Sequence, residues 1–178
     1  GDTLATLPGD VTDESVNEAA VALAEERFGG LDAVVLNAGV PGSGHIDTID
    51  LDVFDRTIEV NLRAAMLGMR ASVPALRRRG AGSIVVTASN TGLAGEEQRF
   101  PYAAAKAGVI NLCRSVALDL GPDAIRVNAV CPGPTITGMT AHLAERDPER
   151  FAALAANVPL GRWAEPREIA EVIVFLAS

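Results

Sequence analysis

The sequence predicts an α/β fold, in which a doubly wound parallel sheet lies between two layers of helices and residues 1–178 form one domain. Short, continuously apolar runs alternate with longer stretches of helical periodicity, which is typical of parallel strands buried on both faces. Polar or glycine-containing residues follow the apolar runs, at the carboxyl ends where such sheets bind ligands. The sequence contains no internal repeat, low-complexity segment or linker, so we predict a single unit.

The N-terminal region is predicted to form a short strand and then a helix. Leu4–Pro8 is the candidate strand, and Thr12 is suited to cap the helix that follows. Asp13 and Glu14 come next, and their negative charges favour the positive end of a helix. Apolar side chains then recur at helical spacing until Gly29-Gly30 ends the pattern.

The rest of the chain continues the alternation. Three further strands are predicted at Leu31–Gly39, Gly82–Ser89 and Ile125–Gly133. Helices are predicted at Leu51–Arg79, from Tyr102 to Leu120 and from Pro166 onward, with a loop containing helical pieces at Pro134–Pro159. We expect four polar strand ends to line one crevice, namely Asp10, Asn37-Ala38-Gly39, Ser89 and Pro132-Gly133.

Composition and charge exclude several classes of function. The net charge of −8 argues against a nucleic-acid partner, because phosphates call for a basic surface. Cys113 and Cys131 do not make a disulfide framework, and with His45 and His142 far apart we predict no metal site. We find no leader peptide and no membrane-spanning run, so we predict a cytoplasmic protein that does not bind membranes.

The segment RFPYAAAKAGVINL contains the only tyrosine and the only lysine of the chain, Tyr102 and Lys106. Positions i and i+4 of a helix share a face, so the two side chains are expected to project together. A nearby ammonium favours the phenolate and lowers a tyrosine pKa from its ordinary value of about 10, which would make Tyr102 a general acid or base. The same spacing occurs in ordinary surface pairs. Ser89, at the end of a strand, favours the catalytic interpretation.

With these residues, the chain resembles the single-domain group of the short-chain dehydrogenase/reductase family, whose fold is Rossmann-like. YAAAK is similar to that family's Tyr-x-x-x-Lys motif, and Ser89 in IVVTAS stands thirteen residues before Tyr102. Further similar segments follow the family's order: GDVTD, LNAG, VNL, RVNAVCPGPTIT and PLGRWAEPREIAEVIVFLAS. In LNAG, Leu36 replaces the first Asn of the family's Asn-Asn-Ala-Gly turn.

The resemblance implies four catalytic residues. Tyr102 would be the acid/base, and Lys106 would lower its pKa and hold ribose hydroxyls of the cofactor. Ser89 would orient the substrate oxygen, and Asn61 would position a water that links Lys106 to solvent. The implied reaction is hydride transfer between a nicotinamide and a carbonyl or secondary alcohol.

The implied cofactor is NAD or NADP, and the resemblance leaves the choice between them open. Its adenosine side would be held by Asp10, Val11, Asn37, Ala38 and Gly39. Its nicotinamide side would be held by Pro132, Gly133 and Thr137, with Tyr102 and Lys106 beside it.

Several of these residues also have plainer explanations. Asp10 can prepare the entry to its helix, and Asn61 can be a buried amide bonded to the backbone. Gly39 and Gly133 can serve tight turns, and Thr137 can be a local cap. The residues alone leave both explanations open.

The resemblance further implies an incomplete domain. We find no counterpart of the family's first two strands with their glycine-rich loop, and GVPGSG (Gly39–Gly44) has the wrong spacing to replace that loop. A last strand is also expected to be absent after Ser178. We therefore predict that Leu4–Pro8 has no partner strand and that the 178-residue chain alone does not bind the cofactor.

The leading prediction is an enzyme, an NAD(P)-dependent dehydrogenase or reductase of a small alcohol or ketone. Its substrate pocket would lie between Thr91–Phe100 and Pro134–Leu160. The alternatives are a non-catalytic dinucleotide-binding or scaffold protein of the same fold, an inactive fragment, and an epimerase or dehydratase. A homo-oligomer, a dimer or tetramer, is expected because the helices at Leu51–Arg79 and Tyr102–Leu120 are apolar over more than one face.

Overall fold

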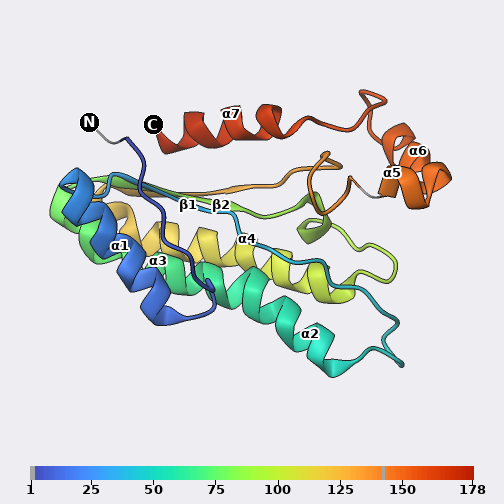
Figure 1. Cartoon of the computed structure of the whole chain (residues 1–178), viewed down its shortest axis with the longest axis horizontal. Coiled ribbons are helices and arrows are strands. Elements are labelled where there is room, and N and C mark those ends of the chain that lie inside the picture. The colour runs from blue at the N-terminus through green and yellow to red at the C-terminus, as the bar shows by residue number, and fades with distance from the viewer. Residues whose placement is uncertain (1–2, 142) are drawn as a thin grey trace.

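The structure, a computed structural model, describes residues 3–141 and 143–178 and has a parallel sheet between two helical layers (Figure 1). The strands β1 (Ala33–Leu36), β2 (Gly82–Thr87) and β3 (Ile125–Val130) pair in the order β1-β2-β3. Both pairings are parallel, and Val85 of β2 lies between Val35 and Asn128. The predicted α/β fold with a parallel sheet is therefore confirmed. His142 lies outside the described residues.

Helices lie on both faces of this sheet. They are α1 (Glu14–Phe28), α2 (Leu51–Ile58), α3 (Ala64–Arg79), α4 (Phe100–Leu120), α5 (Leu143–Arg146), α6 (Pro148–Ala156) and α7 (Pro166–Ala177), with the short turns η1 (Glu59–Arg63), η2 (Asn90–Gly92) and η3 (Gly121–Asp123). Figure 1 shows α1, α3 and α4 on one side of the sheet and α7 on the other, which confirms the three layers. None of the helices in the described part of the chain has the length and hydropathy that crossing a bilayer requires.

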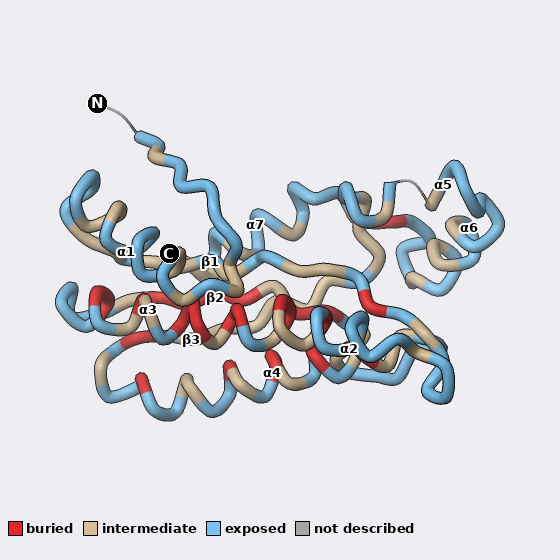
Figure 2. The backbone as a smooth tube through the Cα atoms, turned by 60° about the horizontal axis from the view of Figure 1, so that its bottom comes forward, coloured by how far each residue is buried: buried red, intermediate tan, exposed pale blue. Residues whose placement is uncertain are grey.

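The hydrophobic core lies between the sheet and the layer formed by α3 and α4. The apolar run of β2 contributes the buried side chains Ile84 and Val86, and the two helices contribute Leu76 and Val109. Figure 2 shows that the buried segments gather along these elements. Burying one such side chain stabilises the fold by about 1.5–3 kcal/mol, so this layer determines where α4 lies on the sheet.

On the opposite face of the sheet lies α7, none of whose residues is buried. Val35 of β1, which alternates with core-facing neighbours, is 46% exposed. The end of α7 is nevertheless held firmly on the sheet. Leu176 O accepts hydrogen bonds from Ser83 Oγ at 2.8 Å and from Arg126 Nη1 at 2.7 Å, which joins α7 to β2 and β3.

The predicted strand at Leu4–Pro8 is wrong, because this segment has an irregular conformation. A strand needs a neighbour that pairs with its backbone N–H and C=O groups. Within residues 3–141 and 143–178 the sheet offers it none, which agrees with the expectation that it lacks a partner strand. Leu4 is accordingly 76% exposed, and the segment leads into α1 without joining the sheet.

The cap of α1 is Asp13 and not, as predicted, Thr12. Asp13 Oδ1 accepts a hydrogen bond from Ser15 N at 2.8 Å. Thr12 instead donates its N–H and its hydroxyl to Asp10 Oδ1, at 2.9 and 2.8 Å. A carboxylate is a charged acceptor at the positive end of the helix, which explains why the acidic residue takes the capping position.

The predicted helix at Leu51–Arg79 is interrupted in the middle. Its residues form α2, then the π-helical turn η1, and then α3. A π turn adds one residue to the helical repeat, and such turns are frequent at functional sites. Here the turn contains Asn61, whose side chain is buried towards the segment that follows β1.

Candidate active site

Hydrogen bonds join the carboxyl ends of the three strands. Thr87 Oγ1, at the end of β2, donates to Asn37 Oδ1 at 2.8 Å, just after β1. Asn90 N donates to Pro132 O at 3.0 Å, which joins the segment after β2 to the segment after β3. Asn37, Ser89 and Pro132 therefore lie along one edge of the sheet, where parallel strands bind their ligands.

Helix α4 places Tyr102 and Lys106 on one face, one turn apart. Lys106 Nζ lies 5.6 Å from the centroid of the Tyr102 ring and donates a hydrogen bond to Thr87 O at 2.8 Å. The lysine is only 3% exposed. Because burial disfavours the ammonium form, the pKa of Lys106 falls to about 8.

Burial raises the pKa of Tyr102 above its ordinary value of 10.0, because the phenolate is disfavoured away from water. A hydrogen bond with Ser89 and the charge of Arg99 act in the opposite direction, and the charge of Glu96 adds to the increase. The predicted lowering of this pKa by Lys106 is wrong for this structure. The lysine directs its ammonium to a backbone carbonyl, and burial of the phenol dominates.

Ser89 lies two residues beyond β2 and caps the turn η2. Its Oγ accepts from Thr91 N at 3.2 Å and donates to Asn90 Oδ1 at 3.4 Å. The strand and the turn together hold the hydroxyl close enough to Tyr102 to lower the pKa of the phenol. A hydroxyl and a phenol that meet in this way are able to bond to the same substrate oxygen.

Asn61 joins η1 to the segment after β1. Its Nδ2 donates to Val40 O at 2.9 Å and to Thr57 O at 3.0 Å, and its Oδ1 accepts from Val40 N at 3.2 Å. A Cβ on Gly39 would lie 2.8 Å from Asn61 Oδ1 and 3.5 Å from Lys106 Nζ, so glycine permits this close approach. Asn61 is thus a backbone-bonded buried amide that also lies next to the lysine.

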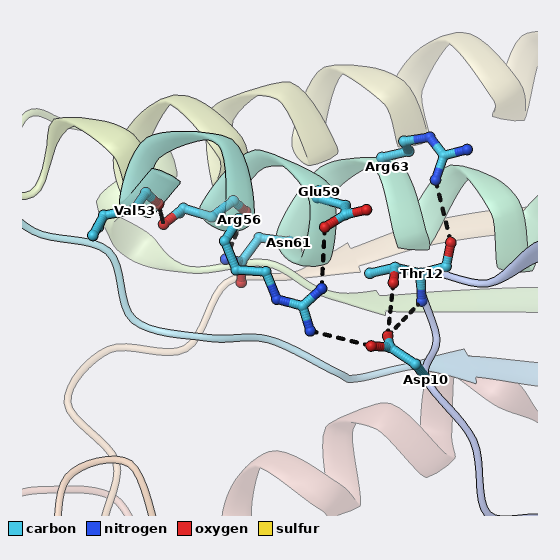
Figure 3. Close-up of polar contacts among 8 residues, drawn as sticks. Asp10, Thr12, Val53, Arg56, Glu59, Asn61 and Arg63 are labelled. Atoms are coloured by element: carbon cyan, nitrogen blue, oxygen red, sulfur yellow. Dashed lines mark hydrogen bonds and ion pairs between the residues drawn. The ribbon is translucent and has the colours of Figure 1, made fainter. Parts of the chain in front are cut away.

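Asp10 belongs to a small polar network with α2, shown in Figure 3. Its Oδ1 accepts both hydrogen bonds from Thr12, and its Oδ2 accepts from Arg56 Nη2 at 3.3 Å. These bonds hold the pKa of Asp10 below its ordinary value. Arg56 also pairs with Glu59 at 3.1 Å, and Arg63 donates to Thr12 O at 3.2 Å. Asp10 therefore organises the entry to α1 while its carboxylate remains about half exposed.

A cavity of about 230 Å³ lies next to this network. Val11, Asn37 and Ala38 line it, together with Asn61 and Thr87. Three of the residues predicted to hold the adenosine half of a dinucleotide therefore meet at one hollow. Apolar walls with a few amide and hydroxyl groups fit a heteroaromatic ring, so the residues present suit such a cofactor.

Of the residues predicted on the nicotinamide side, only Gly133 lines a cavity described here. Gly133 lines a second cavity of about 320 Å³ with Asn90 and Pro134, and Pro132 accepts a bond from Asn90. Thr137 lines neither cavity. Its N–H donates to Thr140 Oγ1 at 2.9 Å, so in this bond the side chain of Thr140 does the capping, and the contact of Thr137 with a nicotinamide stays a prediction.

Arg99 is a residue of this site that the sequence analysis included only within the range Thr91–Phe100 of the predicted substrate pocket. It is the residue before α4, and its Cζ lies 4.8 Å from the centroid of the Tyr102 ring. The signal that would have identified it is its position three residues before Tyr102, which puts it on the same face one turn earlier.

The sheet, the cavity at its carboxyl edge and the Tyr102–Lys106 pair are features found in the class of α/β proteins that bind a dinucleotide. A family model described as "Enoyl-(Acyl carrier protein) reductase" matches residues 1–178. The chain belongs to the short-chain dehydrogenase/reductase family, as its sequence motifs led us to expect. It is thus a member of an oxidoreductase family.

The chain is similar to several curated proteins and solved structures. Trans-4-hydroxycyclohexanecarboxylate dehydrogenase of Sinomonas cyclohexanicum is 47% identical over 169 residues, which is 95% of this chain and 62% of that protein. Inactive 2-(S)-hydroxypropyl-CoM dehydrogenase 2 of Xanthobacter autotrophicus is 38% identical over 172 residues, 95% of this chain and 75% of that one. A solved actinorhodin polyketide ketoreductase with NADPH has a TM-score of 0.89 at 35% identity, covering 95% of this chain and 69% of its own.

The comparison with these relatives shows how much of their length this chain covers and which cofactors their family uses. The chain spans about 62% of the length of the first of them. Together they support NAD or NADP as the cofactor of the family and do not distinguish between the two.

Proposed function

We propose that the protein is an NAD(P)-dependent oxidoreductase that interconverts a secondary alcohol and a ketone, with Tyr102 as the general acid and base. The observation that carries the proposal is the grouping of three side chains at the carboxyl edge of the sheet. Ser89 lies close enough to Tyr102 to act on the pKa of the phenol, and Lys106 Nζ lies 5.6 Å from the tyrosine ring. The dehydrogenase and ketoreductase relatives support the same class of reaction.

Each residue has a defined task in this proposal. Ser89 and Tyr102 hold the carbonyl oxygen of a ketone, and the phenol gives its proton to that oxygen. A bound nicotinamide cofactor supplies the hydride in this direction and accepts it in the other. Lys106 uses one ammonium proton for Thr87 O and has two left for ribose hydroxyls. Asn61 keeps the backbone after β1 next to this lysine.

The cofactor-binding residues are part of the same proposal. Val11, Asn37 and Ala38 would bind the adenosine half in the cavity that they line. Asp10 would receive a polar group of the adenine, and Gly39 would let the cofactor approach the backbone. Pro132, Gly133 and Thr137 would contact the nicotinamide half.

The raised pKa of Tyr102 affects which direction of the reaction is favoured at neutral pH. Burial keeps the phenol protonated at neutral pH, which is the form that reduction of a ketone requires. Alcohol oxidation requires the phenolate, so its rate is expected to rise with pH beyond the range in which reduction is fastest.

Replacement of Tyr102 by Phe tests the proposal in the protein expressed from its complete reading frame. We expect kcat for ketone reduction to fall about a hundred- to ten-thousand-fold, because the proton donor is lost, while the Kd for NAD(P)H stays unchanged. Ser89→Ala should also lower kcat, whereas Ser115→Ala, on the exposed side of α4, should not. Full turnover by Tyr102→Phe would exclude the assigned role.

A non-catalytic dinucleotide-binding protein of the same fold is the second candidate. It is favoured by the raised pKa of Tyr102, which shows no sign of activation by Lys106, and by the existence of a relative named as inactive. Saturable NAD(P)H binding without turnover of any ketone in a broad panel would support this candidate over the first.

A further inference from the structure

A partly buried arginine next to Tyr102 lacks a counter-ion. Arg99 lies with its Cζ 4.8 Å from the centroid of the tyrosine ring. Its Nε is buried and has no hydrogen-bond partner in the described structure. Within residues 3–141 and 143–178, no carboxylate forms an ion pair with it.

Two other arginines of the protein are paired with carboxylates, whereas Arg99 is paired with none in the described part of the chain. Arg162, which lines the second cavity, binds both oxygens of Glu168 at 2.7 Å. Arg56 pairs with two acidic residues. The acid that acts on the same tyrosine, Glu96, accepts a bond from Thr91 Oγ1 at 2.9 Å and forms no ion pair with Arg99.

Hydrogen bonds hold the backbone around Arg99 in place, so its side chain starts from a fixed position. Gln98 adopts a positive φ of 58°, and its carbonyl accepts from Gly44 N at 2.9 Å. Arg99 N donates to Glu96 O at 3.2 Å, and Arg99 O accepts from Ala103 N at 2.8 Å. These bonds place the guanidinium at the N-terminal end of α4, beside the proton donor.

A buried guanidinium donor with no partner is costly, and the ligand that satisfies it best is planar and anionic. A carboxylate accepts two parallel hydrogen bonds from the fork of an arginine, and the positive end of a long helix adds to the attraction. An aromatic face alone leaves the N–H donors unsatisfied. An oxyanion at this point would supply the acceptor that Arg99 Nε lacks in the described structure.

We propose that Arg99 binds a carboxylate of the substrate, so that the protein acts on an alcohol or ketone that also carries a negative charge. The inference rests on the proposed function and deepens it by naming the substrate class. One end of the substrate lies against Ser89 and Tyr102, where the oxygen reacts, and its carboxylate lies at Arg99. The competing explanation is that the cation serves only to adjust the acidity of the phenol, and the experiment separates the two.

Binding is measured first, because it does not depend on turnover. Cyclohexanecarboxylate is titrated into the protein from its complete reading frame by isothermal calorimetry, with the neutral amide of the same ring as control. We expect Arg99→Gln to weaken carboxylate binding roughly 10- to 100-fold, as the loss of a charged hydrogen-bonded pair predicts. Arg167→Gln, which removes a highly exposed arginine on α7, should leave it unchanged. Equal binding by Arg99→Gln and the parent would overturn the inference.

Kinetics then separate substrate binding from adjustment of the phenol. For a cyclohexanone that bears a carboxylate, Arg99→Gln should raise KM roughly 10- to 100-fold, and Arg99→Lys should recover part of the loss. For cyclohexanone itself, KM should stay as in the parent, and any shift in the pH profile of kcat should be the same for both ketones, because the charge of Arg99 also acts on the pKa of Tyr102. An equal change in KM for both ketones would overturn the inference and assign Arg99 to Tyr102 alone. If the parent reduces no ketone in a broad panel, the proposed function fails, and the calorimetry still decides whether Arg99 binds the carboxylate.

Discussion

Lys106 is the single lysine of the chain, and the structure places its ammonium where a guanidinium has little room. Its Nζ lies 2.8 Å from Thr87 O and 3.5 Å from the point that a Cβ on Gly39 would occupy. An ammonium is a compact donor, whereas the fork of arginine is wide and planar. At the residue scale, this explains why Lys106 is a lysine although the fourteen arginines of the chain occupy every other Lys or Arg position.

The lowered pKa of Lys106 predicts how stability depends on pH. Below pH 8 the lysine is charged in the folded and unfolded states, so the cost of burying the charge is present in full. Between about 8 and the ordinary value of 10.5 the folded state loses its proton first, so the free energy of unfolding rises with pH. The rise is at most about 3 kcal/mol.

Urea unfolding of the parent and of Lys106→Met across this window measures the effect. The difference in the free energy of unfolding between them should change as pH rises, because only the parent carries the buried amine. Lys106→Arg, which stays charged throughout, should show no such rise. A difference that is independent of pH would contradict the buried, titrating lysine.

At the scale of elements, the contact between η2 and α4 fixes the distance between Ser89 and Tyr102. The backbones approach so closely that a Cβ on Gly92 would lie 2.7 Å from the carbonyl carbon of Lys106 and 2.9 Å from Ala107 N. Backbone atoms cannot move aside as a flexible side chain can. Only glycine lets the turn lie this close to the helix.

Gly92→Ala is therefore expected to push η2 away from α4. We expect a loss of about 1–3 kcal/mol in the free energy of unfolding, as for other overpacked sites, and a lower kcat because the Ser89 hydroxyl moves from the phenol. Gly95→Ala is the matched control, since nothing lies within 4 Å of a Cβ at that position of the same loop. Identical stability and kcat for the two variants would show that the close contact does not position the serine.

At the scale of the whole molecule, the outer face of α4 favours self-association. Along this helix small or apolar side chains are exposed at Ala104, Ala107, Asn111, Ser115 and Leu118, and the charged Arg114 and Asp119 are exposed beside them. Leu118 is 81% exposed. Small and apolar side chains on one face allow two copies to approach closely, so the predicted homo-oligomer remains a proposal with a definite surface.

Leu118→Glu should shift this oligomer towards smaller species, because the introduced charge would be buried in the interface. Light scattering after size-exclusion chromatography measures the mass. Leu4→Glu makes the same change at an exposed leucine in the irregular N-terminal segment and should leave the mass unchanged. The same mass for both variants and the parent would place the interface elsewhere.

Cofactor binding by the 178-residue chain alone is a second test at this scale. In the described residues, no glycine-rich turn leads directly from a strand of the sheet into a helix, and that arrangement is what holds the pyrophosphate in this fold. We therefore expect no saturable change in NADH or NADPH fluorescence on titration with this chain. The protein from the complete reading frame is the comparison. Clear saturable binding by the chain alone would refute the expectation.

Much of the fold could be predicted because its signals are local. The apolar runs of β1, β2 and β3 identify buried strands, and the spacing of Tyr102 and Lys106 puts them on one helical face. The strand at Leu4–Pro8 was mispredicted because a strand depends on a partner that its own residues do not specify. The π turn at Asn61 was missed because one added residue hardly changes the local apolar pattern.

From α1 onward the sequence by itself determined the alternation of helices and strands, and its motifs determined the family, because both depend on local pattern and motif. The tertiary structure alone decided the direction in which the pKa values of Tyr102 and Lys106 shift, and that no carboxylate of the described chain forms an ion pair with Arg99. Those properties depend on how much water and which charges surround a group. Both are set by segments distant in the sequence that the fold brings together.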